Sequence, residues 1–284
     1  MNKATEVTTE VTYKNAPLIE LIVEIRWPVK TIGIAGGLPI VGDSTPAFDL
    51  WFRDLAEQFR KSGFHELERL VPHDAPPLVQ QPVFRFKKTG TPFPIYQFGH
   101  GIFTINAGPP DYISWENFRP QVEQGLTSLI QSMPEQYKVE SFSKASLRYI
   151  DAFKDDLRDG QSNYEFMRDT LGVSINLPKD LLSHAKDENE ISPTFALQIP
   201  LAEDNGSVLN FQLATGRLRK SDDTDLTLTD TIMDMTYSMN QVLSVDSDAL
   251  LELLDNAHGV INHWFRTLTM NLHNKMQPID KQEQ

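Results

Sequence analysis

The 284-residue sequence contains no cysteine. Disulfide bonds, thiolate nucleophiles and cysteine-ligated zinc are therefore excluded. The glycine-x-serine-x-glycine motif of serine hydrolases is missing as well. No apolar run approaches the ~20 residues that span a bilayer, and the N-terminal segment lacks the apolar stretch of a signal peptide. We therefore expect a soluble cytoplasmic protein with no membrane association.

Positive charge is scarce, and the deficit is uneven. The formal net charge is −13; residues 1–143 contribute −3, and residues 144–284 contribute −10. A strongly acidic surface repels the phosphate backbone of nucleic acids. Nucleic acid is therefore an unlikely partner, and any such site is expected in the first half.

Hydrophobic periodicity divides the first half into alternating strand and helix segments. The expected elements are a strand over 19–27, a helix from Thr45 to Gly63, strands around 79–87, 94–99 and 101–107, and a helix over 115–133. Pro120 is expected either to kink this second helix or to mark its start. The Gly-His-Gly triplet at 99–101 reads as a hairpin turn, since a dinucleotide fingerprint needs a following helix.

The second half repeats this order. It predicts a strand over 146–153, a short helix over 163–171, strands near 194–200, 207–216 and 231–239, and a long helix beginning near Asp246. Each half, 15–143 and 144–271, thus has the order β-α-β-β-β-α, flanked by polar tails at 1–14 and 272–284. We predict an α+β protein that arose by internal duplication, with a mainly antiparallel sheet and helices on one face.

Three segments together resemble a known family. They are NAPLIELIVEIRWP (15–28), YQFGHGIFTINAGPPDYISWENF (96–118) and LRYID (147–151), with IMDMT (232–236) as a weaker fourth. The family is a sporadically distributed group of uncharacterised bacterial and archaeal proteins, in which asparagine is more familiar at the position of Asp151. The patchy distribution of the family resembles that of mobile or defence-associated genes, and the family has no assigned catalytic residues that the resemblance could transfer to this chain. We interpret the motif residues as structural: Glu24, Asn106, Tyr112, Trp115, Tyr149 and Asp151.

A glycine-rich segment at 31–44 lies between a predicted strand and a predicted helix, which is the context of a phosphate-binding loop. Gly36, Gly37 and Ser44 are its candidate ligand contacts. The glycine-lysine-serine/threonine ending is missing, and Asp43 would stand where an anion should bind. A loop without a ligand is therefore the favoured interpretation.

No metal site or cofactor is expected from the sequence. His258 and His263 lie five residues apart on the last helix, about 140° around its axis, and His258 is expected to be a packing or capping residue. The acidic stretch at 221–230 lacks the glycine that a calcium loop needs at its sharp turn. It is better interpreted as a solvated hairpin end.

The strand over 146–153 carries two charged residues, Arg148 and Asp151, on opposite faces. If the first strands of both halves lie side by side, Arg148 is expected to pair with a carboxylate of strand 19–27, Glu24 first. Asp151 is expected to accept hydrogen bonds from another element, such as the backbone amides of the following loop. The alternative is that Arg26 and Arg148 line an anion-binding pocket.

These observations favour a non-enzymatic binding protein: a sensor, an adaptor or a partner subunit. Its expected partner is another protein, for which a neighbouring gene is the first place to look. A homodimer is a further possibility, because the last helix ends in the apolar residues Trp264, Phe265 and Leu268. The alternative function is binding or hydrolysis of a nucleotide or another small anion at the glycine-rich segment.

Overall fold

The computed structural model describes residues 11–35, 38–41, 46–76, 78–174, 180, 184, 191–202, 206–216 and 230–279. Its main feature is one antiparallel sheet of nine strands. In spatial order these are β4 (Glu66–Arg69), β5 (Pro82–Lys87), β6 (Ile95–Gly99), β7 (Ile102–Ala107), β1 (Leu18–Arg26), β8 (Lys144–Phe153), β11 (Asp230–Met239), β10 (Ser207–Gly216) and β9 (Phe195–Pro200). The predicted α+β class with a large antiparallel sheet is confirmed.

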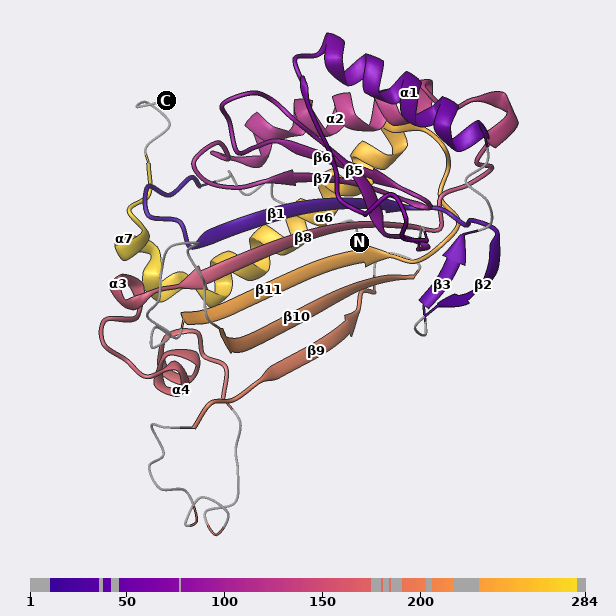
Figure 1. The fold of residues 1–284 in the computed structure, drawn as a ribbon. Helices are drawn as coiled ribbons and strands as arrows, with labels where there is room; N and C mark the ends of the chain where they lie inside the picture. Colours follow the sequence, from indigo (N-terminus) through magenta and orange to yellow (C-terminus); the bar gives the residue numbers. More distant parts are fainter. Residues whose placement is uncertain are drawn as a thin grey trace, which may run out of the picture.

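Three long helices lie over one face of this sheet (Figure 1). They are α1 (Pro46–Lys61), α2 (Trp115–Gln131) and α6 (Ser247–Leu268). Helix α6 packs on β8 and β11 and also contacts α2. The shorter helical segments are α3 (Asp155–Arg158), α4 (Asn163–Glu165), α7 (His273–Met276), the 3-10 turns Glu135–Tyr137 and Met270–Leu272, and a π-turn at Phe166–Thr170.

The core forms between the helices and the sheet because each strand alternates apolar and polar residues. In β1, Leu21, Val23 and Ile25 have no exposed surface and point toward the helices. Helix α1 presents Trp51 and Leu55 at helical spacing, and both are fully buried. Alternation of this kind leaves one face of the sheet apolar and packed and the other face polar.

The first strands of the two halves, β1 and β8, are neighbours at the centre of the sheet, as predicted. They pair with Val23 opposite Leu147 and Ile22 opposite Arg148. On the far side of each lies the last strand of the same half, β7 beside β1 and β11 beside β8. The strand order is therefore equivalent on both sides of the central pair, although an ancestral duplication stays a prediction.

The segment expected as a phosphate-binding or flexible loop contains a β-hairpin instead. Its strands are β2 (Thr31–Ala35) and β3 (Leu38–Val41), and they pair with each other outside the main sheet. The side chains of Ile32 and Ile34 are 67% and 75% exposed. The β-branched residues of this segment account for the strands, a signal that its glycines obscured. Gly36, Gly37 and Ser44 lie outside the described residues.

Strand β4 differs from the sequence prediction, and helix α2 decides between two alternatives that the sequence left open. Strand β4 was not expected, because none of its four residues is buried and it carries no alternating pattern. Helix α2 begins before Pro120, since the side chain of Ser114 caps it by accepting a hydrogen bond from the backbone N–H of Asn117. Pro120 therefore lies inside the helix and does not mark its start.

Part of each predicted tail packs onto the fold. The backbone N–H of Asn15 donates to the carbonyl of Met276 (2.9 Å), and that of Ile279 donates to the carbonyl of Thr12 (2.8 Å). Leu272 and Met276 are buried. Among the described helices, none has the length and apolar character required to cross a bilayer.

Candidate functional site

The sheet face opposite the long helices carries mainly polar side chains. Strand alternation places Glu24 and Arg26 of β1 there, beside Lys144, Ser146 and Arg148 of β8. On β11 the same alternation places Asp234, Thr236 and Ser238 on this face, opposite the buried Met233 and Met235. These residues, together with Asn210 and Gln212 of β10 and Gln198 of β9, are called the open face below.

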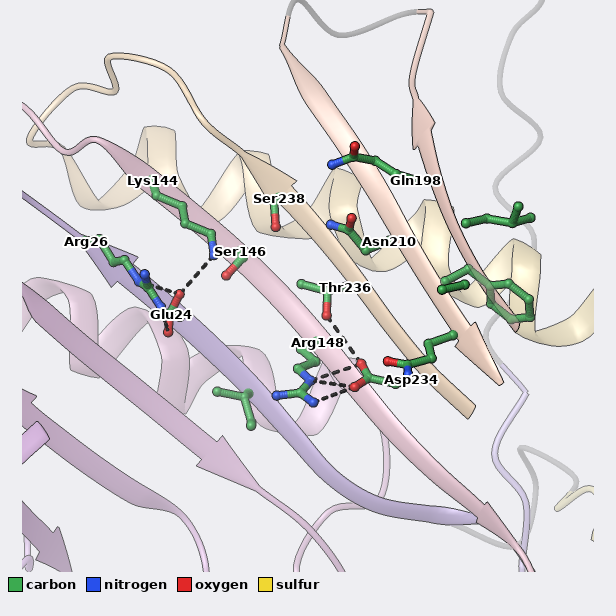
Figure 2. Close-up of a pocket in the computed structure, with 15 residues that line it drawn as sticks. Glu24, Arg26, Lys144, Ser146, Arg148, Gln198, Asn210, Asp234, Thr236 and Ser238 are labelled. Carbon is green, nitrogen blue, oxygen red and sulfur yellow. Dashed lines mark hydrogen bonds and ion pairs between the residues drawn. The ribbon is translucent and has the colours of Figure 1, made fainter. Parts of the chain in front are cut away.

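The open face is hollowed along the centre of the sheet (Figure 2). The hollow has a volume of about 580 Å³ and reaches from β1 across β8, β11 and β10 to β9. Its labelled side chains project from the strands into the same space. The two arginines proposed from sequence as anion contacts, Arg26 and Arg148, both line it.

Arg148 pairs with Asp234 of β11 and not with Glu24, so the predicted partner is wrong. Its Nε donates to both carboxylate oxygens of Asp234 (3.0 and 3.1 Å), and its Nη2 donates to Oδ2. Arg148 lies opposite Thr236 on β11, which makes Asp234 its diagonal neighbour. The Arg148 side chain is 43% exposed, so it has no buried charge that β1 must neutralise.

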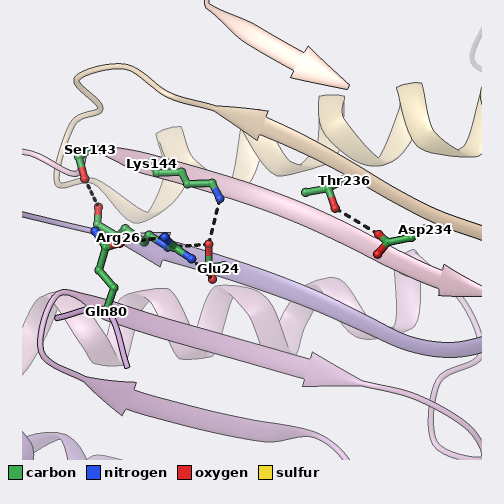
Figure 3. Close-up of polar contacts among 7 residues, drawn as sticks. All are labelled: Glu24, Arg26, Gln80, Ser143, Lys144, Asp234 and Thr236. Atoms are coloured by element: carbon green, nitrogen blue, oxygen red, sulfur yellow. Dashed lines mark hydrogen bonds and ion pairs between the residues drawn. The ribbon is translucent and has the colours of Figure 1, made fainter. Parts of the chain in front are cut away.

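Glu24 has two other partners on the open face (Figure 3). Arg26 Nη2 donates to its Oε2 (3.0 Å), and Lys144 Nζ donates to its Oε1 (3.2 Å). Arg26 Nη1 also donates to the side-chain oxygen of Gln80 (2.8 Å). Burial alone would raise the pKa of Glu24, but the hydrogen bonds and charges of Arg26 and Lys144 outweigh it and lower the pKa. Glu24 is therefore held ionised.

The other carboxylate of β1, that of Glu20, also has a hydrogen-bond partner. Asn106 of β7 donates from Nδ2 to Oε1 of Glu20 (2.7 Å), and Thr104 donates from Oγ1 to Oδ1 of Asn106 (2.9 Å). Asn106 thus links β7 to β1 by a side-chain hydrogen bond, and its role as a family motif residue stays a prediction. The polar network of the sheet extends through it from β1 to β7.

The other motif residues gather on the helix side of the sheet. The hydroxyls of Tyr112 and Tyr149 lie 3.3 Å apart, and that of Tyr149 lies 2.8 Å from Nδ1 of His258 on α6. Trp115 stacks on the ring of His258 and donates from its indole nitrogen to Asp255 (2.8 Å). His258 is a packed residue, as expected, and burial lowers its pKa to about 4.

Asp151 lies beside this cluster. The prediction that it accepts hydrogen bonds from another element, such as backbone amides of the following loop, is wrong. The residue is 3% exposed, and its Oδ2 is buried without a hydrogen-bond partner. It points to the helix side because it follows Leu147 and Tyr149 at a period of two. Burial, with a smaller contribution from the negative charge of Asp234, raises the pKa of Asp151 to about 8.

Neither family models, nor curated proteins, nor solved structures match this chain. The resemblance stated from sequence motifs therefore stays a prediction. Within the described part of the chain, no three histidine, aspartate or glutamate side chains meet as a metal-binding group. Of the acidic stretch at 221–230, Asp230 alone is described, as the first residue of β11.

Among the residues that the sequence did not reveal as site residues are Lys144 and Asp234 on the open face, and His258 as a partner of Tyr149. Asp234 carried a usable signal, because it alternates with buried methionines on a predicted strand. Its pairing with Arg148 depends on which strand follows β8 in the sheet, and a sequence pattern does not reveal that order. Lys144 lies two residues before the predicted strand 146–153, so the prediction assigned it to neither face of the sheet, whereas β8 begins at Lys144.

Proposed function

We propose that the protein is a non-enzymatic binding protein and that the open face receives another protein. The observation that supports this proposal most is the polar face of a nine-stranded sheet, which none of the three long helices covers. This face is hollowed at its centre, and the side chains that line the hollow are held by mutual ion pairs. Ordered polar groups lose little conformational entropy on binding, which favours recognition of a partner surface.

The charges of the hollow support binding over acid–base chemistry. A general acid or base works best when its pKa lies near the working pH. The Asp234 hydrogen bond raises the pKa of Arg148, and the two cations beside Glu24 lower the pKa of that carboxyl. Both groups therefore keep their charge across neutral pH, where they can hold a partner by hydrogen bonds and ion pairs.

Charge reversal on the open face tests this proposal. The chain is co-expressed with each product of its neighbouring genes, and co-elution of a stable complex is measured. Arg148→Asp combined with Asp234→Arg keeps an ion pair between β8 and β11 but reverses its direction, so the fold is preserved while the recognised pattern changes. Loss of the complex in this double variant supports the proposal, and retention of the complex argues against the open face as the interface.

A second candidate, binding of a small anion, is favoured by one observation. Three cations, Arg26, Lys144 and Arg148, face two carboxylates, Glu24 and Asp234, in a molecule whose net charge is −13. None of the described residues of the 31–41 hairpin lines this hollow. The arginines would therefore make the contacts to the anion. A ligand that binds the native state raises its melting temperature. An unchanged melting temperature with phosphate and with nucleotides would remove this candidate.

A further inference from the structure

A second, smaller cavity lies on the opposite side of the sheet, beneath the C-terminal half of α6. Its volume is about 120 Å³. The walls come from the N-terminal segment, the loop before α2, β8, β11 and α6. Three tyrosines and one phenylalanine line it: Tyr13, Tyr112, Tyr149 and Phe265. Ile113 lines it too and is 53% exposed, so the cavity reaches the surface.

Asp151 supplies the carboxyl group of this otherwise mostly apolar wall. Because its Oδ2 is buried and accepts no hydrogen bond, the group lacks the partner that a buried polar atom ordinarily has. Met233 and Leu18, which lie directly opposite it on the neighbouring strands, offer no side-chain donor. An unpaired carboxylate in such surroundings is costly, and a donor with positive charge would remove that cost.

The chemistry of the walls restricts the class of ligand that the cavity can bind. An anion would meet no lysine or arginine among the described lining residues, and an uncharged apolar group would leave the oxygen of Asp151 unpaired. A hard metal ion needs about six oxygen ligands, whereas Asp151 is the one carboxylate among the described lining residues. Aromatic faces attract organic cations, and the negative field of a chain of charge −13 favours their approach.

The volume of the cavity limits the size of the ligand. An engineered protein cavity of about 150 Å³ accommodates benzene. The present volume of about 120 Å³ is slightly smaller, so it suits a group of roughly five or six non-hydrogen atoms. Short alkylammonium ions fall in this range and carry N–H donors for the carboxylate.

We propose that this cavity binds a small primary alkylammonium ion, with the carboxylate of Asp151 as its counter-ion and the rings of Tyr13, Tyr112, Tyr149 and Phe265 around its alkyl chain. The inference is independent of the open face, since the two sites lie on opposite sides of the sheet. The ammonium group would donate to the oxygen of Asp151 that has no partner in the unliganded protein.

The full chain is titrated by calorimetry with n-butylammonium chloride and, separately, with n-butanol, at constant ionic strength and at a pH near 8. The two probes share an alkyl chain and differ in the charged, hydrogen-bonding head group. We expect saturable binding of n-butylammonium and markedly weaker binding of n-butanol. Equal binding of both probes would show an apolar cavity without charge recognition and would overturn the proposal, as would no binding of n-butylammonium.

Asp151→Asn provides the decisive variant, because it preserves the shape of the side chain and removes its charge. Loss of a charge-assisted hydrogen bond is expected to weaken n-butylammonium binding about 10- to 100-fold. Asp230→Asn is the matched control: Asp230 is a buried aspartate of the neighbouring strand that does not line the cavity. Unchanged affinity in Asp151→Asn, or an equal loss in Asp230→Asn, would contradict the assignment.

Discussion

Arg148 of β8 and Asp234 of β11 form a bidentate ion pair that joins two central strands across the open face of the sheet. The arginine side chain is 43% exposed and the aspartate side chain 19% exposed. Water therefore screens the pair in part, and each side chain is also available to a partner. The pair organises the hollow more than it stabilises the fold.

Arg148→Ala is accordingly expected to cost about 1 kcal/mol of unfolding free energy, the upper range for exposed ion pairs. The loss of ~3–5 kcal/mol that follows removal of one partner from a buried pair is not expected. Urea denaturation of Arg148→Ala, Asp234→Ala and the double variant measures the coupling energy between the two side chains. A loss of 3 kcal/mol or more in the single arginine variant would show that the pair is part of the core after all.

Asp151→Asn is expected to stabilise the protein, increasingly so at higher pH. The pKa of Asp151 is about 8 in the folded chain, against an ordinary value of 3.8. Between these two values the folded state holds a proton that the unfolded state has released. The wild-type protein therefore loses about 1.4 kcal/mol of stability for each pH unit of rise in this interval. The asparagine variant carries no such titration.

The comparison requires chemical denaturation of both proteins at several pH values between these limits. Other groups that titrate contribute equally to both proteins, so the difference between the two curves isolates Asp151. His258, Tyr112 and Tyr149 border the same cavity, and Asp234 acts on Asp151 through its charge. Curves that stay parallel from acid to neutral pH would mean that Asp151 is ionised in the folded state.

Gly99→Ala is expected to destabilise the protein by about 1–3 kcal/mol, the usual cost of overpacking. A Cβ atom at Gly99 would lie 2.0 Å from the backbone oxygen of Gln81, and a backbone atom cannot rotate away. The disturbance would reach the open face, because the adjacent Gln80 binds Arg26. Thermal and urea denaturation measure the effect.

Gly33→Ala is the matched control for this prediction. Gly33 also lies in a strand, and a Cβ atom there would meet nothing within 4 Å. Its substitution is expected to leave stability nearly unchanged. If both alanine variants unfold alike, the close approach between β6 and the segment before β5 is not what the structure indicates.

The sequence was most informative where burial imposes a period. The elements β1, β11 and α6 and their buried faces were predictable from alternation and from an apolar stripe. Residues such as Val23, Met235 and Leu254 are apolar and are fully buried against the core. It was least informative where no burial pattern exists, as in β4 and in the exposed β2–β3 hairpin. Local chemistry there fits a loop and a strand equally well.

The candidate sites were likewise predictable only in part. Placing Arg26 and Arg148 on one open face required only strand alternation and the adjacency of β1 and β8. The partner of Arg148 depended on β11 lying beside β8 and on a diagonal register that brings in Asp234. The isolation of Asp151 depended on packing by α6 and the N-terminal segment, which lie far from it in sequence. Long-range geometry of this kind has no local sequence signal.

Site-specific photo-cross-linking in the native cells detects whether a partner protein binds the open face. A photoreactive residue replaces Gln212, exposed on the open face, or Glu252, exposed on α6 on the opposite side. We expect a discrete cross-linked protein from the Gln212 position. It should be absent from the Glu252 position and abolished by the Arg148→Asp/Asp234→Arg reversal. Cross-linking from Glu252 alone, or equally from both positions, would contradict it.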